Sequence, residues 1–196
     1  MTDYKTVLGI LAVVINFVGF APYIKNTLAG KTKPHAFSWL IWGVLEATGF
    51  LAQLSKGGGA GAWVTGASAA MVFFIAGIAL YRRETEINII DWLAFFGGLL
   101  GIILWVITKN PLTAVILVVI SDALAFVPTF RKSYYHPEQE TLFEYICTAT
   151  KYFISLFALE ALNLTTWLYP ASMIVTNLSL VTMSVFRKNK LNKINA

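Results

Sequence analysis

Apolar residues in this chain form long blocks separated by short polar stretches, and they do not alternate with polar residues. Seven blocks are long enough to cross the hydrocarbon core of a bilayer as helices, which takes about 17 to 25 residues each. They run over 6–24, 36–55, 61–81, 89–108, 111–130, 141–160 and 168–186. A lipid-facing barrel would show short alternating segments. The pattern therefore predicts an all-α integral membrane protein with seven transmembrane helices.

The composition agrees with this class. Of the 196 residues, 57% are hydrophobic and only 13% are charged, and the mean hydropathy is +0.68. A soluble domain of this size needs a more charged surface to cover its core. Cys147 is the single cysteine of the sequence, which rules out an internal disulfide.

Two stretches of the chain repeat one pattern. The first reads NFVGFAP from Asn16 to Pro22, and the second reads DALAFVP from Asp122 to Pro128. Many solute carriers are built from an internal repeat of membrane helices. We therefore expect the first three spans to correspond to the last three, with Asn16 equivalent to Asp122.

The fourth span has no counterpart in the repeat. Three helices reverse the direction of the chain, so two triplets joined directly would be inverted in the membrane. The extra span restores the direction, which predicts two parallel three-helix bundles joined by a linker helix. The expected units are residues 1–83 for the first bundle, 84–110 for the linker helix, and 111–196 for the second bundle with a basic cytoplasmic tail.

The net charge of +5 does not indicate a nucleic-acid partner, because the basic residues lie in loops between apolar blocks. One predicted face holds only Lys5, Lys56 and Lys109. Eleven basic residues lie on the opposite face: Lys25, Lys31, Lys33, Arg82, Arg83, Arg131, Lys132, Arg187, Lys188, Lys190 and Lys193. The positive-inside rule then predicts that the N-terminus is outside and the C-terminus is cytoplasmic.

The three-plus-one-plus-three plan, with a proline near the cytoplasmic end of the first and fifth spans, resembles the SWEET and PQ-loop transporter superfamily. The resemblance rests on the topology and on Pro22 and Pro128. Tyr23 and Thr129 stand where PQ-loop proteins usually have glutamine. The resemblance implies movement of a sugar, amino acid or vitamin-like metabolite by alternating access, without ATP hydrolysis. It also likens Asn177 to the pocket asparagine of sugar-carrying relatives.

The two repeated prolines are candidate hinges. Proline has no N–H to donate, so Pro22 frees the carbonyl of Val18 and Pro128 frees that of Leu124. Each helix can bend at that point, which suits a carrier that opens alternately to the two sides. A static kink that improves packing is the alternative interpretation.

Polar side chains recur on one face of the second and sixth spans. Glu46 shares its face with Trp42, and Lys151 lies at a similar depth beside Tyr152, the repeat equivalent of Glu46. An isolated ionised side chain at the membrane centre costs about 2.5 to 3.5 kcal/mol. Glu46 and Lys151 therefore either form a bridge that joins the two halves, or line the solute site. The rings of Trp42 and Tyr152 would stack on a solute or face lipid.

Asp122 is a second candidate for solute binding or coupling. Removal from water disfavours the charged carboxylate, which makes Asp122 a candidate for proton coupling. A hydrogen bond between helices is the structural alternative. Its repeat equivalent Asn16 is expected to bond a neighbouring helix or to contact solute hydroxyls.

These features predict a membrane transporter of a small polar solute, with facilitated or proton-coupled movement. Two alternatives stay open: a sorting or signalling receptor of the same fold, and a vitamin facilitator of the nicotinamide-riboside type, whose aromatic pocket the sequence does not show. The expected partners are the solute and the lipid bilayer, with homo-oligomerisation left open. The sequence shows no nucleophile–base set, phosphate-binding loop or metal-ligand cluster, so we expect neither an enzyme nor a cofactor.

Overall fold

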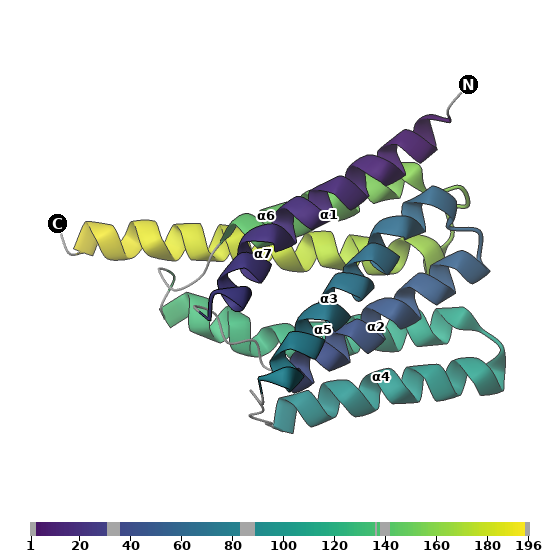
Figure 1. Cartoon of the computed structure of the whole chain (residues 1–196), viewed down its shortest axis with the longest axis horizontal. Coiled ribbons are helices and arrows are strands. Elements are labelled where there is room, and N and C mark those ends of the chain that lie inside the picture. Colours follow the sequence, from purple (N-terminus) through teal and green to yellow (C-terminus); the bar gives the residue numbers. More distant parts are fainter. Residues whose placement is uncertain (1–2, 31–35, 83–88, 136, 138–141, 195–196) are drawn as a thin grey trace.

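The computed structural model describes residues 3–30, 36–82, 89–135, 137 and 142–194. These residues form helices and contain no strand. Figure 1 shows the helices, which are α1 (Tyr4–Leu28), α2 (Ala36–Ser55), the short 3-10 helix η1 (Gly59–Ala62), α3 (Trp63–Tyr81), α4 (Ile89–Thr108), α5 (Pro111–Tyr135), α6 (Leu142–Ala158) and α7 (Leu164–Ile194). The prediction of an all-α fold is confirmed for this part of the chain.

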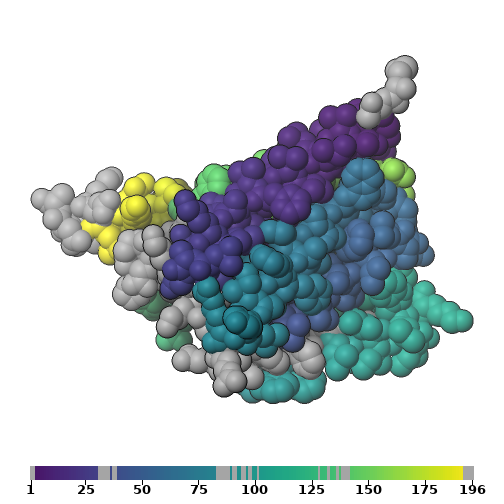
Figure 2. Space-filling model, viewed as in Figure 1, coloured from purple at the N-terminus to yellow at the C-terminus, as the bar shows by residue number. Residues whose placement is uncertain are grey.

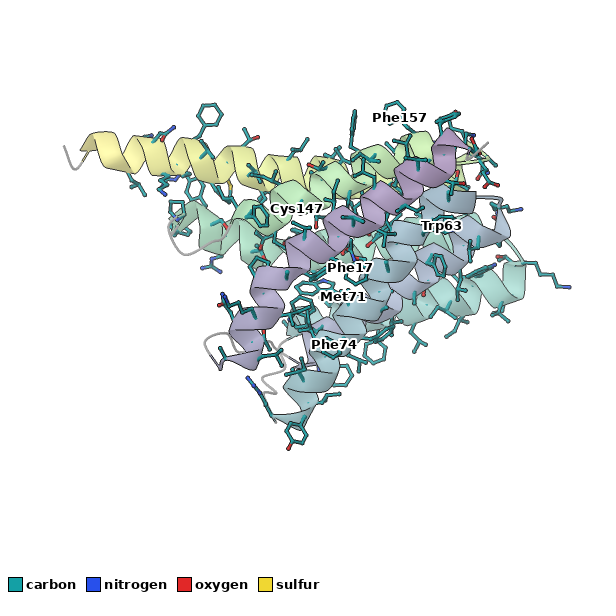
Figure 3. All side chains as sticks on the ribbon, turned by 45° about the horizontal axis from the view of Figure 1, so that its top comes forward. Phe17, Trp63, Met71, Phe74, Cys147 and Phe157 are labelled. Carbon is teal, nitrogen blue, oxygen red and sulfur yellow. The ribbon has the colours of Figure 1, made fainter. Side chains whose placement is uncertain are left out.

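Among the described residues, four helical segments are long and apolar enough to cross a membrane. They are Tyr4–Leu28, Gly59–Tyr81, Pro111–Tyr135 and Leu164–Leu191. Two of the other predicted spans, α2 and α6, are shorter and carry charged residues near their middles, Glu46 and Lys151. Large apolar side chains cover much of the outer surface, among them Phe17, Phe74 and Phe157 (Figure 3). Such a surface suits contact with lipid.

The last helix is longer than the sequence pattern predicts. The seventh span was expected over 168–186, whereas α7 begins at Leu164 and continues to Ile194. Asn163 caps the helix, because its carbonyl accepts the N–H of Trp167 at 3.1 Å and its side chain accepts that of Thr166 at 3.3 Å. At the other end, the basic tail continues the helix and projects beyond the bundle (Figure 2).

The two helix triplets have matching neighbours. Within each triplet the third helix packs against the first and the second, so α3 contacts α1 and α2, and α7 contacts α5 and α6. Between the triplets the first helix of each packs against the second helix of the other, which pairs α1 with α6 and α5 with α2. The fourth helix packs on α5 and α2, at the edge of the bundle (Figure 1).

In each triplet an arginine binds the end of the first helix; Arg82 directly follows the third helix α3, and Arg187 lies in the C-terminal part of the third helix α7. Arg82 donates hydrogen bonds to the carbonyls of Thr27 and Leu28 at the end of α1. Arg187 donates from Nε to the carbonyl of Tyr134 near the end of α5, at 2.9 Å. The last carbonyls of a helix lack intrahelical partners and carry partial negative charge, so a cation stabilises them.

The bundle is tightly closed at the end that carries the η1 turn. The α6–α7 link hydrogen-bonds the α2–η1 link, with the N–H of Ala161 donating to the carbonyl of Gly57 at 2.9 Å. Gly57 has φ of 76°, a left-handed conformation that suits the end of α2 and favours glycine. Lys5 Nζ donates to the carbonyl of Leu159 at 2.8 Å, and Gln53 Nε2 donates to that of Thr166 at 2.8 Å.

Gly61 allows η1 to approach α6 at this closed end. A Cβ atom at position 61 would lie 2.6 Å from the backbone nitrogen of Leu159 and 2.7 Å from the carbonyl oxygen of Ser155. Backbone atoms cannot move aside cheaply, so the contact excludes any side chain at this position.

We expect Gly61→Ala to lower the stability of the detergent-solubilised protein by about 1 to 3 kcal/mol, because it overpacks the contact with α6. The matched control is Gly77→Ala in α3, where a Cβ would meet nothing within 4 Å. That change should be neutral or raise stability by up to about 1 kcal/mol through helix propensity. Chemical unfolding of the two variants measures the difference, and equal stability would contradict the tight closure.

Candidate functional site

A cavity of about 500 Å³ lies between the two helix triplets. Its wall includes residues from both triplets: Gly19, Phe20, Pro22, Tyr23, Asn26, Trp39, Trp42, Glu46, Val72, Asp122, Phe126, Thr129, Phe143, Glu144, Tyr145, Thr148, Lys151, Met173 and Asn177. The cavity therefore brings together most of the candidate site residues of the sequence. Those on the wall are Pro22, Trp42, Glu46, Asp122, Lys151 and Asn177.

Four polar residues lie near the middle of their helices and form what we call the mid-depth layer. These are Asn16 in α1, Glu46 in α2, Asp122 in α5 and Lys151 in α6. Because α1 pairs with α6, Asn16 lies beside Lys151. Glu46 is on α2, which packs on both α3 and α5, and it lies between Lys151 and Asp122. The layer therefore combines one amine with two carboxylates, and Asp122 is the carboxylate farther from the amine.

Aromatic residues lie between the mid-depth layer and one end of the cavity. In α2, Trp42 precedes Glu46 by one helical turn, and in α5, Phe126 follows Asp122 by one turn. Since α2 begins at the end where α5 finishes, both rings lie toward that end (Figure 1). Asn26 and Phe143 are exposed on the wall there, so this end is the mouth of the cavity.

The rings nearest the mouth form an aromatic cluster of Phe20, Tyr23, Trp39 and Trp42. The ring centroids of Tyr23 and Trp39 lie 4.9 Å apart, and those of Trp39 and Trp42 lie 5.6 Å apart in an edge-to-face arrangement. Phe20 meets Trp39 at 6.3 Å. The hydrophobic pattern did not reveal this cluster, because α1 and α2 meet only through the fold. The sequence features that could have indicated the cluster are Phe20 and Tyr23 beside Pro22, and Trp39 and Trp42 in the second span.

Lys151 is held by two neutral groups. Its Nζ donates to Asn16 Oδ1 at 2.7 Å and to Ser68 Oγ at 2.8 Å, and the side chain is 2% exposed. The ammonium also lies 5.1 Å from the ring centroids of Phe20 and Tyr152. These contacts join α6 to α1 and α3, across the boundary between the triplets.

The predicted Glu46–Lys151 bridge does not occur among the described residues. Lys151 donates instead to Asn16 on α1 and Ser68 on α3. Glu46 lies near the ammonium but has no hydrogen bond to it in the described structure. Glu46 and Lys151 therefore form no direct bridge among the described residues, and the choice between a structural and a solute-binding role for the pair stays a prediction. Ser68, in the third span, was not identified from the sequence as a partner of the amine.

The carboxylates of the mid-depth layer are less well satisfied than the amine. Asp122 is 5% exposed, and no described residue donates a hydrogen bond to it. Glu46 Oε2 is buried with no hydrogen-bond partner in the described structure, as is Nδ2 of Asn16. Buried polar atoms are normally hydrogen-bonded, so the layer has donor and acceptor capacity that a solute or water in the cavity can satisfy. The structural alternative for Asp122, a hydrogen bond to another helix, does not occur among the described residues.

Two candidate site residues lie behind the wall of the cavity. Asn16 is 1% exposed and reaches the site through Lys151. Tyr152 is fully buried in the apolar core beyond the mid-depth layer, where its ring packs edge-to-face on Tyr169 with centroids 5.7 Å apart. Asn177 lies on the wall, and its Nδ2 donates to the carbonyl of Met173 at 2.8 Å.

Glu144 adds a further carboxylate to the wall, nearer the mouth. Thr148 Oγ1 donates to Glu144 Oε1 at 3.0 Å. Lys151 follows Thr148 by less than one turn of the same helix, deeper in the cavity. The sequence placed Glu144 near a span end, but its position in the cavity follows from the packing of α6 on α1. Of the described charged residues on the wall, three are acidic and one is basic.

Both repeated prolines lie inside continuous helices. α1 runs through Pro22, which is exposed and lies on the wall near the mouth. α5 likewise runs through position 128. The side chain of Pro128 lies outside the described residues, and the next residue, Thr129, lies on the wall.

The arrangement suits reversible binding of a small polar molecule. In the part of the chain that the structure describes, no three His, Cys, Asp or Glu side chains are placed to hold a metal ion. The cavity combines charged groups at its depth with aromatic rings nearer its mouth, and it is closed at the far end by the η1 turn and the α6–α7 link.

Comparison of the chain with models of protein families, with curated proteins and with solved structures gives no match. The geometry of the cavity is therefore the basis on which a function can be assigned.

We expect Asn16→Ala to lower the free energy of unfolding by about 1 to 3 kcal/mol, because it removes one of two hydrogen-bond acceptors from a buried ammonium. Asn16→Asp keeps an acceptor oxygen and should retain stability. Asn26→Ala, at an exposed position of the mouth, is the matched control and should stay within about 0.5 kcal/mol. Unfolding in detergent measures all three, and equal effects of Asn16→Ala and Asn26→Ala would refute the role of Asn16.

Proposed function

We propose that this protein is a membrane transporter that moves a small polar solute by alternating access. The observation that carries the proposal is the cavity between the triplets, in which buried carboxylates, one amine and an aromatic cluster lie at mid-depth and toward one end only. Ionisable groups at the middle of a membrane bundle are costly and mark solute or ion pathways. Glu46, Asp122, Lys151 and Asn177 are the proposed solute contacts or coupling groups.

The proposed architecture has seven spans, with two parallel triplets joined by α4 as a linker helix. The matching neighbours of the two triplets support a duplicated unit. So do the arginines that bind the ends of α1 and α5. A pair of equivalent bundles around a midplane site is the plan of several carrier families, and it agrees with the resemblance to SWEET and PQ-loop transporters.

The conformation corresponds to one state of such a cycle. The cavity reaches exposed residues at the end where α1 finishes, while the η1 turn and the α6–α7 link close the other end. With the basic residues facing the cytoplasm, this is the inward-facing state. Pro22 and Pro128 are the proposed hinges for the change to the outward-facing state.

Labelling of a cysteine introduced at Lys190 tests the proposed orientation. If the C-terminus is cytoplasmic, an impermeant thiol reagent should reach this cysteine only after cells are lysed.

The aromatic cluster also favours solutes that carry a ring. Trp39 and Trp42 border the cavity with Tyr23 and Phe20, and flat heteroaromatic groups stack on such side chains. A vitamin-like metabolite is therefore a candidate beside an amino acid or sugar. A receptor of the same fold would bind its ligand without moving it, so uptake measurements separate the two functions.

A thermal-shift screen of the purified protein against metabolites tests the binding site. We expect at least one solute to raise the unfolding temperature of the wild-type protein, and this shift to be lost in Glu46→Gln and Lys151→Met, since both side chains lie on the wall. Glu160→Gln, an exposed carboxylate at the closed end, is the matched control and should keep the shift. If every solute stabilised all the variants as it does the wild type, the cavity would not be the site.

Locking the closed end tests alternating access. A Cβ atom at Gly57 would lie 3.3 Å from Cβ of Ala161, close to the spacing of about 3.5 to 4.5 Å in disulfides. In a Cys147→Ala background, we expect oxidation of the Gly57→Cys, Ala161→Cys protein in liposomes to abolish uptake of the solute found in the screen, and reduction to restore it. A cysteine at Gly57 is strained equally in the oxidised and the reduced protein, so this strain cannot explain a difference in uptake between them.

The two single-cysteine variants should be insensitive to oxidant, and uptake that survives a verified cross-link would refute opening at this end.

Measurement of uptake into liposomes also separates facilitated from proton-coupled movement. Coupling through Asp122 requires uptake that depends on an imposed pH gradient, with that dependence lost in Asp122→Asn. Equal uptake with and without the gradient would exclude it.

A further inference from the structure

We infer that the solute is a small organic cation, held between the Glu46 and Asp122 carboxylates and the aromatic cluster. This inference rests on the proposed function and names the class of solute that the cavity takes. It follows from the charges of the mid-depth layer, from the hydrogen bonds already made there, and from the rings that border it.

The charges of the mid-depth layer do not balance. Glu46 and Asp122 contribute two carboxylates, and Lys151 contributes one amine. When all three are ionised, the layer is one positive charge short of neutrality. Charge in a medium of low dielectric constant is stabilised by an opposite charge, so the layer favours a cation over a neutral or anionic solute.

The missing charge belongs beside Asp122 on α5. Lys151 is already bound by Asn16 and Ser68 on the side of α1 and α3. Asp122 accepts no hydrogen bond from the described residues although it is 5% exposed. A carboxylate that is so deeply buried, lies on a cavity wall and has no protein partner is the group with most to gain from a cationic ligand.

The rings beside this position can also bind a cation. Trp42 lies one turn from Glu46 on the same face of α2, and its ring meets Trp39 at 5.6 Å. Indole faces attract cations more strongly than other rings, within about 6 Å of the centroid. The cavity already contains one such contact, since the ammonium of Lys151 lies 5.1 Å from the centroid of Phe20. Acids at the base and rings toward the mouth are typical of organic-cation sites.

A neutral sugar would use these groups poorly. It needs alternating hydrogen-bond donors and acceptors, whereas the carboxylates of the mid-depth layer only accept when they are ionised. A proton on one carboxylate would supply the missing charge in another way. A layer that is neutralised by a proton should bind a charged ligand no better than a neutral ligand of the same shape. A layer that is neutralised by the solute should bind the charged ligand better, so a comparison of the two ligands distinguishes these cases.

Isosteric pairs of probes provide the test. Choline and 3,3-dimethylbutan-1-ol share one shape, and guanidinium and urea share another, but only the first of each pair is charged. We expect choline or guanidinium at millimolar concentration to raise the unfolding temperature of the wild-type protein in detergent at neutral pH, and the neutral isostere to leave it unchanged. A tenfold excess of sodium chloride over the probe controls for ionic strength.

Three variants assign the effect to the site. Asp122→Asn and Glu46→Gln remove one charge at nearly constant shape, and Trp42→Leu removes a ring. Each should weaken binding of the cation about tenfold. Glu160→Gln, outside the cavity, should not change it. Since Asp122→Asn removes a carboxylate that has no protein partner among the described residues, it should fold as well as the wild type does, which keeps the test decisive.

The outcomes separate this inference from the proposed function. Stabilisation by cations alone, lost in the variants of the cavity, supports the inference. If neutral or anionic metabolites stabilise the protein and lose their effect in Trp42→Leu, the cavity binds solutes but the charge assignment is wrong. If both members of every pair act equally, or neither acts, the inference is overturned. If no metabolite of any charge stabilises the protein, that result would contradict the proposed function as well.

Discussion

The structure depends on one constraint, that a charge in the middle of an apolar bundle must have a partner. Lys151 meets it through Asn16 and Ser68, which come from two other helices. These bonds can form only when α6 packs against α1 and α3. The ammonium therefore selects the pairing of one triplet with the other, in addition to the apolar contacts of the core.

The same constraint is not met on the opposite side of the cavity. Glu46 and Asp122 lie on the paired helices α2 and α5, but the protein supplies no hydrogen bond to Asp122 in the described structure. The repeat in the sequence aligns Asn16 with Asp122. The amide of Asn16 accepts a hydrogen bond from Lys151, whereas the carboxylate of Asp122 accepts none from the described residues.

The two ends of the bundle differ in how tightly they are closed. Close contacts between glycines and the α6–α7 link seal one end, where a Cβ at Gly61 would meet backbone. At the other end, rings and exposed polar residues border an accessible cavity. A carrier needs ends that open in turn, and a seal built from a few hydrogen bonds and small residues can be broken at modest cost.

By itself, the sequence determined the helical class, the limits of most helices and the repeat that aligns Asn16 with Asp122, since these depend on local apolar periodicity and on spacing along the chain. It also identified most of the polar residues on the cavity wall, because charge inside an apolar block is conspicuous. Only the tertiary structure decided that Lys151 binds Asn16 and Ser68 rather than Glu46, and that Phe20, Tyr23, Trp39 and Trp42 form one cluster. Both depend on which helices become neighbours. That choice is made by packing between distant segments, and no local pattern encodes it.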